Sequence, residues 1–381
     1  MQLFERAIII LYNHGDVIVF EEFASVVNLG DYIYKDFLSD DEELEYKKRI
    51  GSFHKHIRAM SKQEECFLCH KQFTSFCNSH SVPAFVLRNI AINGEVLTPN
   101  SFIQHPALKN KKGVNQAGTF NLICRECDSK IFSDYENPEN YNNEPTQKML
   151  AQIALKNNLM YISKRNYEIN LFNQLHEEFS LSSDMRDIQN NVKSLDLKDY
   201  FESFQTAKKA ISLGNCNSYY LCYYNQLDYV VPIAFQSSIA LISDFKGQTI
   251  NDTFNMSASY KIKTINICVF PLDDKSVIFM FIENGDKRYR NFYREFNKLD
   301  KEDQLLALTY ILFLYSEEVY LSKSIPSDIL KNQNLINTCK KTIDVLSPAP
   351  NVNALQVVKK NFNLSDRFNI PNLLSEKYKV R

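Results

Sequence analysis

The organisation of this chain follows from three short stretches. They read Cys-Phe-Leu-Cys at residues 66–69, Asn-Ser-His-Ser-Val-Pro at residues 78–83, and Phe-Asn-Leu-Ile-Cys-Arg-Glu-Cys-Asp-Ser-Lys at residues 120–130. The first and third stretches each contain a Cys-x-x-Cys pair, and about fifty residues separate the pairs. Two such pairs can each hold one side of a tetrahedral metal ion, whereas four reduced core thiols are the alternative. The spacing predicts a structural zinc site with the ligands Cys66, Cys69, Cys124 and Cys127.

Polar side chains accompany these cysteines. His80 lies in the second stretch, Asn121 begins a short apolar run that is predicted to be a strand, and Asp128 follows Cys127 where a helix is expected to begin. A neutral imidazole can take a proton from water near pH 7. Carboxylate and amide oxygens are the ligands that Mg²⁺ and Mn²⁺ prefer. The three residue types together indicate a hydrolytic site.

Over residues 64–136 the sequence resembles the HNH endonuclease family, the ββα-metal nucleases, in its four-cysteine form. The resemblance implies a treble-clef or ββα-metal zinc module in which His80 is the general base. It implies that Asn121 orients the histidine or helps to hold a metal ion. It also implies that Asp128 binds a catalytic Mg²⁺ or Mn²⁺.

Two positions next to this motif affect the implied metal site. Family members often have Asp or Glu directly before the histidine, and this chain has Ser79. Glu136 follows Asp128 by about two helical turns, which returns it to a similar helix face. Glu136 is therefore predicted to supply the second carboxylate for the divalent ion.

Basic residues between the second and third stretches are predicted to contact a nucleic-acid backbone. From residue 81 to 120 the four basic residues outnumber the single acidic one, Glu95. Such a segment can grip phosphates, although a solvated surface loop is an equal alternative. The predicted contacts are Arg88, Lys109, Lys111 and Lys112.

Composition limits the class of protein. The chain has 381 residues, of which 44% are hydrophobic and 23% charged, a composition typical of a globular protein. Its net charge is −1, so any contact with phosphate must come from local basic residues. Nine cysteines, four of them in zinc spacing, favour a reducing compartment. No signal peptide is apparent, and the most apolar segment, residues 305–315, is too short to cross a bilayer. We therefore expect a cytoplasmic protein without a membrane partner, and residues 305–315 as a buried helix.

The chain is predicted to be α+β with several parts. The parts are an N-terminal mainly helical layer (1–60), in which helix and strand cannot be separated at 7–11 and 17–20, an HNH-like domain (61–145), a helical connector (146–210), a separate α+β domain (211–345) and a basic tail (346–381). The α+β domain is expected to bind a regulatory ligand or partner protein, or to dimerise. The tail is expected to contact phosphate or a partner, or to remain solvated.

Strand patterns begin near residue 218. Predicted strands cover 219–224, 229–234 and 239–245, and a hairpin is formed by 263–271 and 276–283. The following helix has aromatic residues at core spacing, beginning with Tyr289, beside a solvated basic face.

These observations favour a metal-dependent HNH-like endonuclease that acts on nucleic acid, with DNA preferred over RNA. Similar two-part architectures in bacteria often serve restriction or anti-phage defence, an analogy at the level of architecture. Two alternatives stay open. The zinc module can be a non-catalytic nucleic-acid or protein adaptor, or the substrate can be RNA.

Overall fold

A computed structural model describes residues 40–99, 101, 111–179, 183–214, 217–341 and 353–381. Helices and strands are mixed in this part of the chain, which confirms the predicted α+β class. Of the expected N-terminal layer it contains α2 (Asp40–Met60), whereas the apolar runs at 7–11 and 17–20 lie outside the described residues, as does Lys109.

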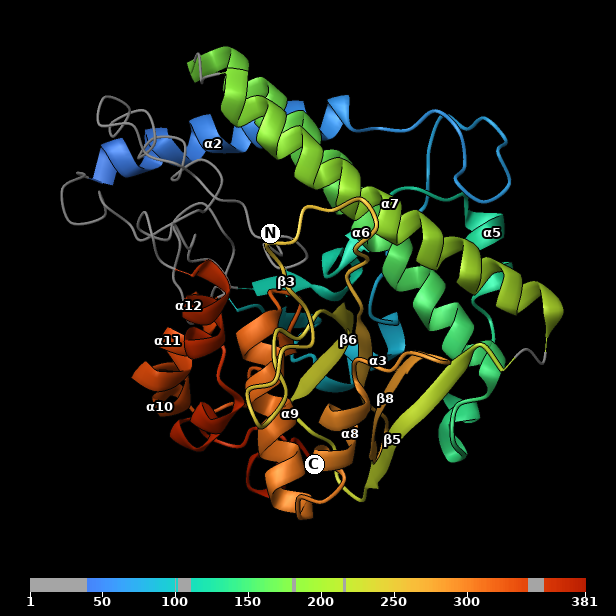
Figure 1. The fold of residues 1–381 in the computed structure, drawn as a ribbon, viewed down its shortest axis with the longest axis vertical. Helices are drawn as coiled ribbons and strands as arrows, with labels where there is room; N and C mark the ends of the chain where they lie inside the picture. Colours follow the sequence, from blue (N-terminus) through green and yellow to red (C-terminus); the bar gives the residue numbers. More distant parts are fainter. Residues whose placement is uncertain (1–39, 100, 102–110, 180–182, 215–216, 342–352) are drawn as a thin grey trace.

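The centre of the molecule is a seven-stranded sheet in the order β3-β2-β9-β6-β7-β8-β5 (Figure 1), in which every pair of neighbouring strands is antiparallel. Its strands are β2 (Glu95–Leu97), β3 (Lys111–Gly113), β5 (Tyr219–Leu227), β6 (Ile233–Ile239), β7 (Ile265–Pro271), β8 (Ser276–Glu283) and β9 (Tyr320–Leu321). The predicted hairpin is confirmed as β7 and β8.

This sheet crosses the expected domain boundaries. Strands β2 and β3 come from the range expected to form the nuclease domain, yet Leu97 of β2 pairs with Leu321 of β9. Strand β9 also pairs with β6. The boundaries expected near residues 145 and 210 therefore do not divide the sheet into independent units.

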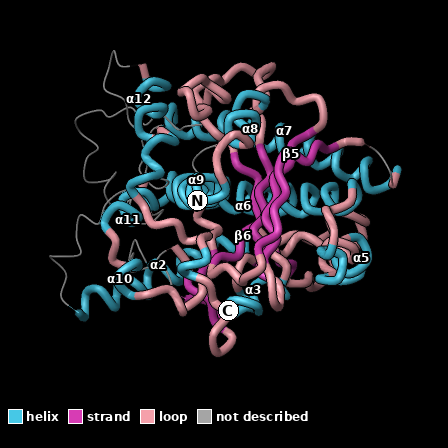
Figure 2. The backbone as a smooth tube through the Cα atoms, turned by 90° about the horizontal axis from the view of Figure 1, so that it is seen from below, coloured by secondary structure: helices cyan, strands magenta, loops and turns pink. Residues whose placement is uncertain are grey.

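Each central strand contributes to two hydrophobic cores, one on either face of the sheet (Figure 2). Ile267 and Val269 of β7 belong to the core that contains the C-terminal helices, whereas Cys268 and Phe270 belong to the core beneath the cysteine module. Successive strand residues point to opposite faces, so a strand covered on both sides is apolar throughout.

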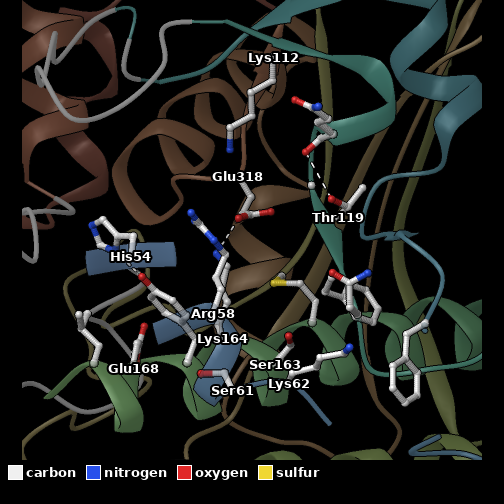
Figure 3. A pocket seen from close by; sticks show the side chains of 18 of the residues that line it. His54, Arg58, Ser61, Lys62, Lys112, Thr119, Ser163, Lys164, Glu168 and Glu318 are labelled. Carbon is white, nitrogen blue, oxygen red and sulfur yellow. Dashed lines mark hydrogen bonds and ion pairs between the residues drawn. The ribbon is translucent and has the colours of Figure 1, made fainter. Parts of the chain in front are cut away.

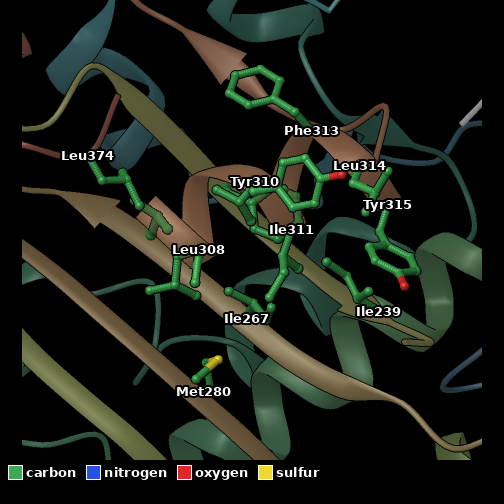
Figure 4. Close-up of a cluster of buried hydrophobic side chains, with 14 of the residues drawn as sticks. Ile239, Ile267, Met280, Leu308, Tyr310, Ile311, Phe313, Leu314, Tyr315 and Leu374 are labelled. Atoms are coloured by element: carbon green, nitrogen blue, oxygen red, sulfur yellow. The ribbon is translucent and has the colours of Figure 1, made fainter. Parts of the chain in front are cut away.

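Helices α8 (Arg290–Phe296) and α9 (Lys301–Tyr315) belong to the first of these cores. The predictions for both are confirmed: Tyr289, Phe292 and Phe296 are buried, and α9 is buried over most of its length. Figure 4 shows side chains of α9, among them Leu308 and Ile311, near Ile267 and Met280 of the sheet.

The range 146–210 forms two long helices, α6 (Gln147–Phe179) and α7 (Ser183–Leu213), that lie side by side (Figures 1 and 2). Residues 149–162 of α6 are all buried. This segment is therefore part of the core and not only a connector.

The C-terminal segment packs against the same core. Phe362, Leu364 and Leu374 are buried, and Arg367 forms a two-pronged ion pair with Asp303 of α9. This differs from a free basic tail, because burial of these apolar side chains holds the segment in place. Its elements are α12 (Ala354–Asn361), η3 (Leu364–Asn369) and η4 (Glu376–Tyr378), preceded by α10 (Ser327–Leu330) and α11 (Gln333–Lys340).

Two sequence predictions were wrong in detail. The second predicted strand begins later, at Ile233, and the range 240–245 is a loop in which Asp244 accepts two backbone hydrogen bonds. A buried aspartate that caps a turn competes with strand geometry.

In the part of the chain that the structure describes, no helix combines the length and apolarity needed to cross a bilayer.

Candidate functional site

The three sequence stretches meet at a small two-stranded sheet and one helix. Strand β1 (Ser79–His80) pairs antiparallel with β4 (Thr119–Phe120), placing Ser79 opposite Phe120 and His80 opposite Thr119. Helix α5 (Arg125–Ile131) begins directly after Cys124, whose sulfur accepts a hydrogen bond from the Cys127 N–H. The other elements between the strands are α3 (Ala84–Ile90) and η1 (Val114–Gln116), and η2 (Pro138–Asn142) follows α5.

A glycine permits the close approach of this hairpin to the main sheet. Gly118 has φ +62, and a Cβ placed there would lie 2.6 Å from Ser81 Oγ and 2.7 Å from the Tyr320 hydroxyl. Its carbonyl accepts the Ser81 N–H at 2.7 Å. The space that a side chain would need is therefore occupied by neighbouring atoms.

The four cysteines converge as the spacing predicts. The sulfurs of Cys66, Cys69, Cys124 and Cys127 all lie within 4.8 Å of one another. In a tetrahedral zinc site with Zn–S bonds of about 2.3 Å the sulfurs are about 3.8 Å apart, so this donor set fits one zinc ion. A fifth thiol, Cys77, is not one of these four donors. Burial and the nearby charge of Asp128 raise the pKa of Cys77 to about 12.

Backbone donors favour the metal-binding form of one ligand. Burial alone would raise the pKa of Cys66, but N–H groups of Cys124, Cys69 and Leu68 lower it to about 7. The Cys124 N–H lies 3.3 Å from Cys66 Sγ. Because a thiolate, and not a thiol, binds metal, these amides favour the metal-binding form of Cys66.

His80 is held by a backbone carbonyl. Its Nε2 lies 3.0 Å from the carbonyl oxygen of Val114. A carbonyl can only accept, so in the neutral ring Nε2 carries the hydrogen and Nδ1 keeps its lone pair. Within the described residues Nδ1 has no hydrogen-bond partner. The imidazole is therefore oriented with one basic nitrogen available.

Asn121 braces the chain just before β1. Its amide nitrogen donates to the carbonyl of Cys77 and to the side-chain oxygen of Asn78, both at 2.9 Å. In the part of the chain that is described, no hydrogen bond links Asn121 or Asp128 to His80. The three predicted residues thus share one module, but they do not form one hydrogen-bonded group.

Asp128 and Glu136 both contact a lysine that sequence reasoning missed, but they do not share a helix face as expected, because α5 ends at Ile131 and Glu136 lies in the turn that follows. Lys156 of α6 places its Nζ 2.6 Å from Asp128 Oδ1 and 3.0 Å from Glu136 Oε1. The Lys156 side chain is 0% exposed, and its Nζ also lies 2.9 Å from Ser79 Oγ. Ser79 donates to the same Asp128 oxygen at 2.5 Å, so the β1 residue that contacts α5 is Ser79 and not His80.

This arrangement bears on the predicted Mg²⁺ or Mn²⁺. The ammonium of Lys156 occupies the position between Asp128 Oδ1 and Glu136 Oε1, and a second cation cannot share that position. The site formed by the Asp128 and Glu136 carboxylates therefore does not fit a divalent ion while Lys156 is in place. The only sequence signal for Lys156 was a lysine inside a helical segment whose other residues are mostly apolar.

The predicted basic contacts are dispersed. Lys111 pairs with Glu95 at 3.1 Å, and Glu95 also pairs with Lys323 at 2.5 Å. Arg88 lies at a separate recess beside α3, whereas Lys112 lines a larger cavity together with Asn121. Of the described members, Lys112 therefore shares a cavity with Asn121, one of the predicted site residues.

Comparisons of the chain with protein-family models, with curated proteins and with solved structures found no match.

Proposed function

We propose that this chain hydrolyses phosphodiester bonds in nucleic acid, as an HNH-like nuclease with a structural zinc ion and with DNA as the favoured substrate. The observation that carries the proposal is the orientation of His80. Its Nε2 donates to the Val114 carbonyl at 3.0 Å, which leaves Nδ1 as an acceptor for a proton from water. The antiparallel β1 and β4 strands, followed by α5, support the same proposal.

Each residue then has a separate task. His80 takes a proton from the attacking water at Nδ1, and Asn121 positions the chain that leads into β1. Lys112 contributes positive charge near the phosphate. No step is assigned to a divalent ion at Asp128, because Lys156 already neutralises that carboxylate.

The zinc ion would have a structural role. Four thiolates complete a tetrahedral shell and leave no position for a reactive water molecule. The ion would join the 66–69 turn to the start of α5, and thereby hold β1 and β4 in register.

The test is cleavage of plasmid DNA and of total RNA by zinc-loaded full-length protein, alone and with Mg²⁺ or Mn²⁺. We expect His80→Ala to lose cleavage at unchanged zinc content. The matched control is His56→Ala, an exposed histidine on α2, which should cleave like the wild type. Full-length protein is required, because truncation near residue 145 would separate β2 from β9.

Cleavage that survives in His80→Ala would refute the assigned role. Preference for the RNA substrate would replace DNA by RNA without changing the chemistry.

A second candidate, a zinc-dependent adaptor without catalysis, is favoured by the ammonium of Lys156 between the two predicted metal ligands. An adaptor would bind nucleic acid or a protein partner, and His80→Ala would leave that binding intact. Absence of cleavage by folded, zinc-loaded protein that binds DNA or RNA would support this second candidate over the nuclease.

A further inference from the structure

A cavity of about 690 Å³ lies beside the β1–β4 hairpin. Its walls come from α2, the segment 74–76, the region from β3 to residue 121, α6, and the segment 317–320 (Figure 3). This volume is within the range of about 300–1,000 Å³ that small-molecule sites occupy. Sequence analysis gave no indication of it, because its walls are distant in the chain.

The cavity contains basic side chains that form no ion pair with the described part of the chain. Arg58 of α2 and Lys112 of β3 line it, and neither has an ion-pair partner among the described residues. Lys62 also lines it, and its Nζ donates to the Thr74 carbonyl at 3.2 Å. Figure 3 shows Lys112 and Arg58 approaching the cavity from different sides.

The acidic residues in the wall are already engaged. Lys164 pairs with Glu318 at 2.6 Å, and Glu168 pairs with Arg165. Glu317 also has an interaction within the protein. Since these carboxylates have partners, the charge left for a ligand is positive, which favours an anion.

Neutral donors and aromatic rings complete the wall. The Ser163 hydroxyl can donate a hydrogen bond to a phosphate oxygen, whereas the Thr119 hydroxyl donates to the Gln116 carbonyl at 3.4 Å and both Asn121 amide hydrogens are donated within the protein. Phe76 and Tyr167 offer ring surfaces. Thr119 is also the residue directly opposite His80 in the β1–β4 pair. His80 itself does not line the cavity, and Phe120, which is opposite Ser79, lines it as well, so the cavity adjoins the β1–β4 hairpin as a whole.

We infer that this cavity binds backbone phosphates of a single nucleic-acid strand beside the β1–β4 hairpin that carries His80. The strand assignment rests on the proposed nuclease function, whereas anion binding rests on the cavity alone. Arg58 and Lys112 would contact phosphates, and a base would stack on Phe76 or Tyr167. A free nucleotide offers the same phosphate chemistry, and the experiment separates the two sources.

The experiment measures fluorescence anisotropy of a labelled 12-nucleotide single strand with full-length, zinc-loaded His80→Ala protein, so that binding is read without cleavage. We expect Arg58→Gln/Lys112→Gln to weaken binding at least about tenfold at 0.1 M salt. We also expect the slope of log affinity against log salt to fall by about 1.4, which is about 0.7 for each lost phosphate contact. Lys55→Gln, an exposed lysine of α2 outside the cavity, is the matched control and should change affinity less than about twofold.

Three results would overturn the inference. Equal losses in the control and the double variant would indicate non-specific attraction. No loss in the double variant, shown by circular dichroism to be folded, would exclude the cavity. Competition by a nucleoside monophosphate as effective as competition by unlabelled strand would assign the site to free nucleotides. If the wild type does not cleave but the double variant still loses strand binding, the cavity inference stands and the nuclease proposal fails.

Discussion

Replacing Lys156 by methionine tests whether its ammonium is the positive charge that neutralises Asp128 and Glu136. Methionine keeps an apolar stem against Phe132, over which the Lys156 ammonium lies at 3.8 Å, but it removes the charge. Asp128 and Glu136 then lose a partner at 2.6 and 3.0 Å. Breaking a fully buried pair costs about 3–5 kcal/mol. The two carboxylates are 21% and 31% exposed, so solvent screening reduces the expected loss to about 2–3 kcal/mol.

The assay is urea denaturation followed by circular dichroism at pH 7, with Lys156→Met, Asp128→Asn and the double variant. The double variant leaves less unpaired charge than Lys156→Met alone, so the two losses should not add, and the coupling should be at least about 1 kcal/mol. An exposed lysine of α5, Lys130→Met, is the control for loss of one surface charge, and we expect it to lie within about 0.5 kcal/mol of the wild type.

A divalent ion provides the second readout. Without Lys156, the oxygens of Asp128 and Glu136 face one another with no cation between them, and they can accept Mg²⁺. With a Kd of about 1 mM, 5 mM Mg²⁺ would stabilise Lys156→Met by about 1 kcal/mol and would leave the wild type unchanged. Stabilisation of the wild type by Mg²⁺ that disappears in Asp128→Asn would refute our reasoning, because the ion would then displace the ammonium.

Three further predictions concern the surroundings of the site. Cys66→Ser should lower the zinc content of purified protein, and unchanged zinc content would contradict the four-cysteine site. A chelator should lower the melting temperature of the wild type but not that of the variant. Burial would raise the pKa of Glu318, but Lys164 and Lys112 bring it to about 2 from 4.5, so its stabilisation is complete above about pH 4.5 and is lost as the pH falls toward 2. In denaturation at pH 7 and pH 3, Glu318→Gln should therefore show a smaller pH dependence than the wild type, by up to about 2 kcal/mol, and an equal dependence would contradict the ion pair. Gly118→Ala should lower the free energy of unfolding by about 1–3 kcal/mol more than Gly247→Ala. Both glycines have positive φ, but of the two only Gly118 has atoms within 4 Å of the added Cβ. Equal melting temperatures of the two variants would show that the neighbouring atoms move aside.

Local sequence patterns were sufficient for several elements. Two strand-like runs on either side of Asp273 and Asp274 predicted the β7–β8 hairpin, and the apolar run at 305–315 predicted a buried helix. Cysteine spacing even predicted a long-range contact, since two Cys-x-x-Cys pairs must meet to complete four ligands. In these cases the information lies in a short segment, or in a chemistry that permits few arrangements.

The tertiary structure alone decided the rest. The sequence contained no sign that β2 would join β9, that Lys156 would reach Asp128, or that Arg58 and Lys112 would share a cavity. Periodicity records which face of a helix or strand is apolar, but it does not specify which distant element covers that face. The meeting of a lysine with two carboxylates, or of five segments around one cavity, depends on packing across many intervening residues. Therefore the sequence by itself determined the cysteine module and its polar residues, and the packing of α6 and the sheet determined their electrostatic partners.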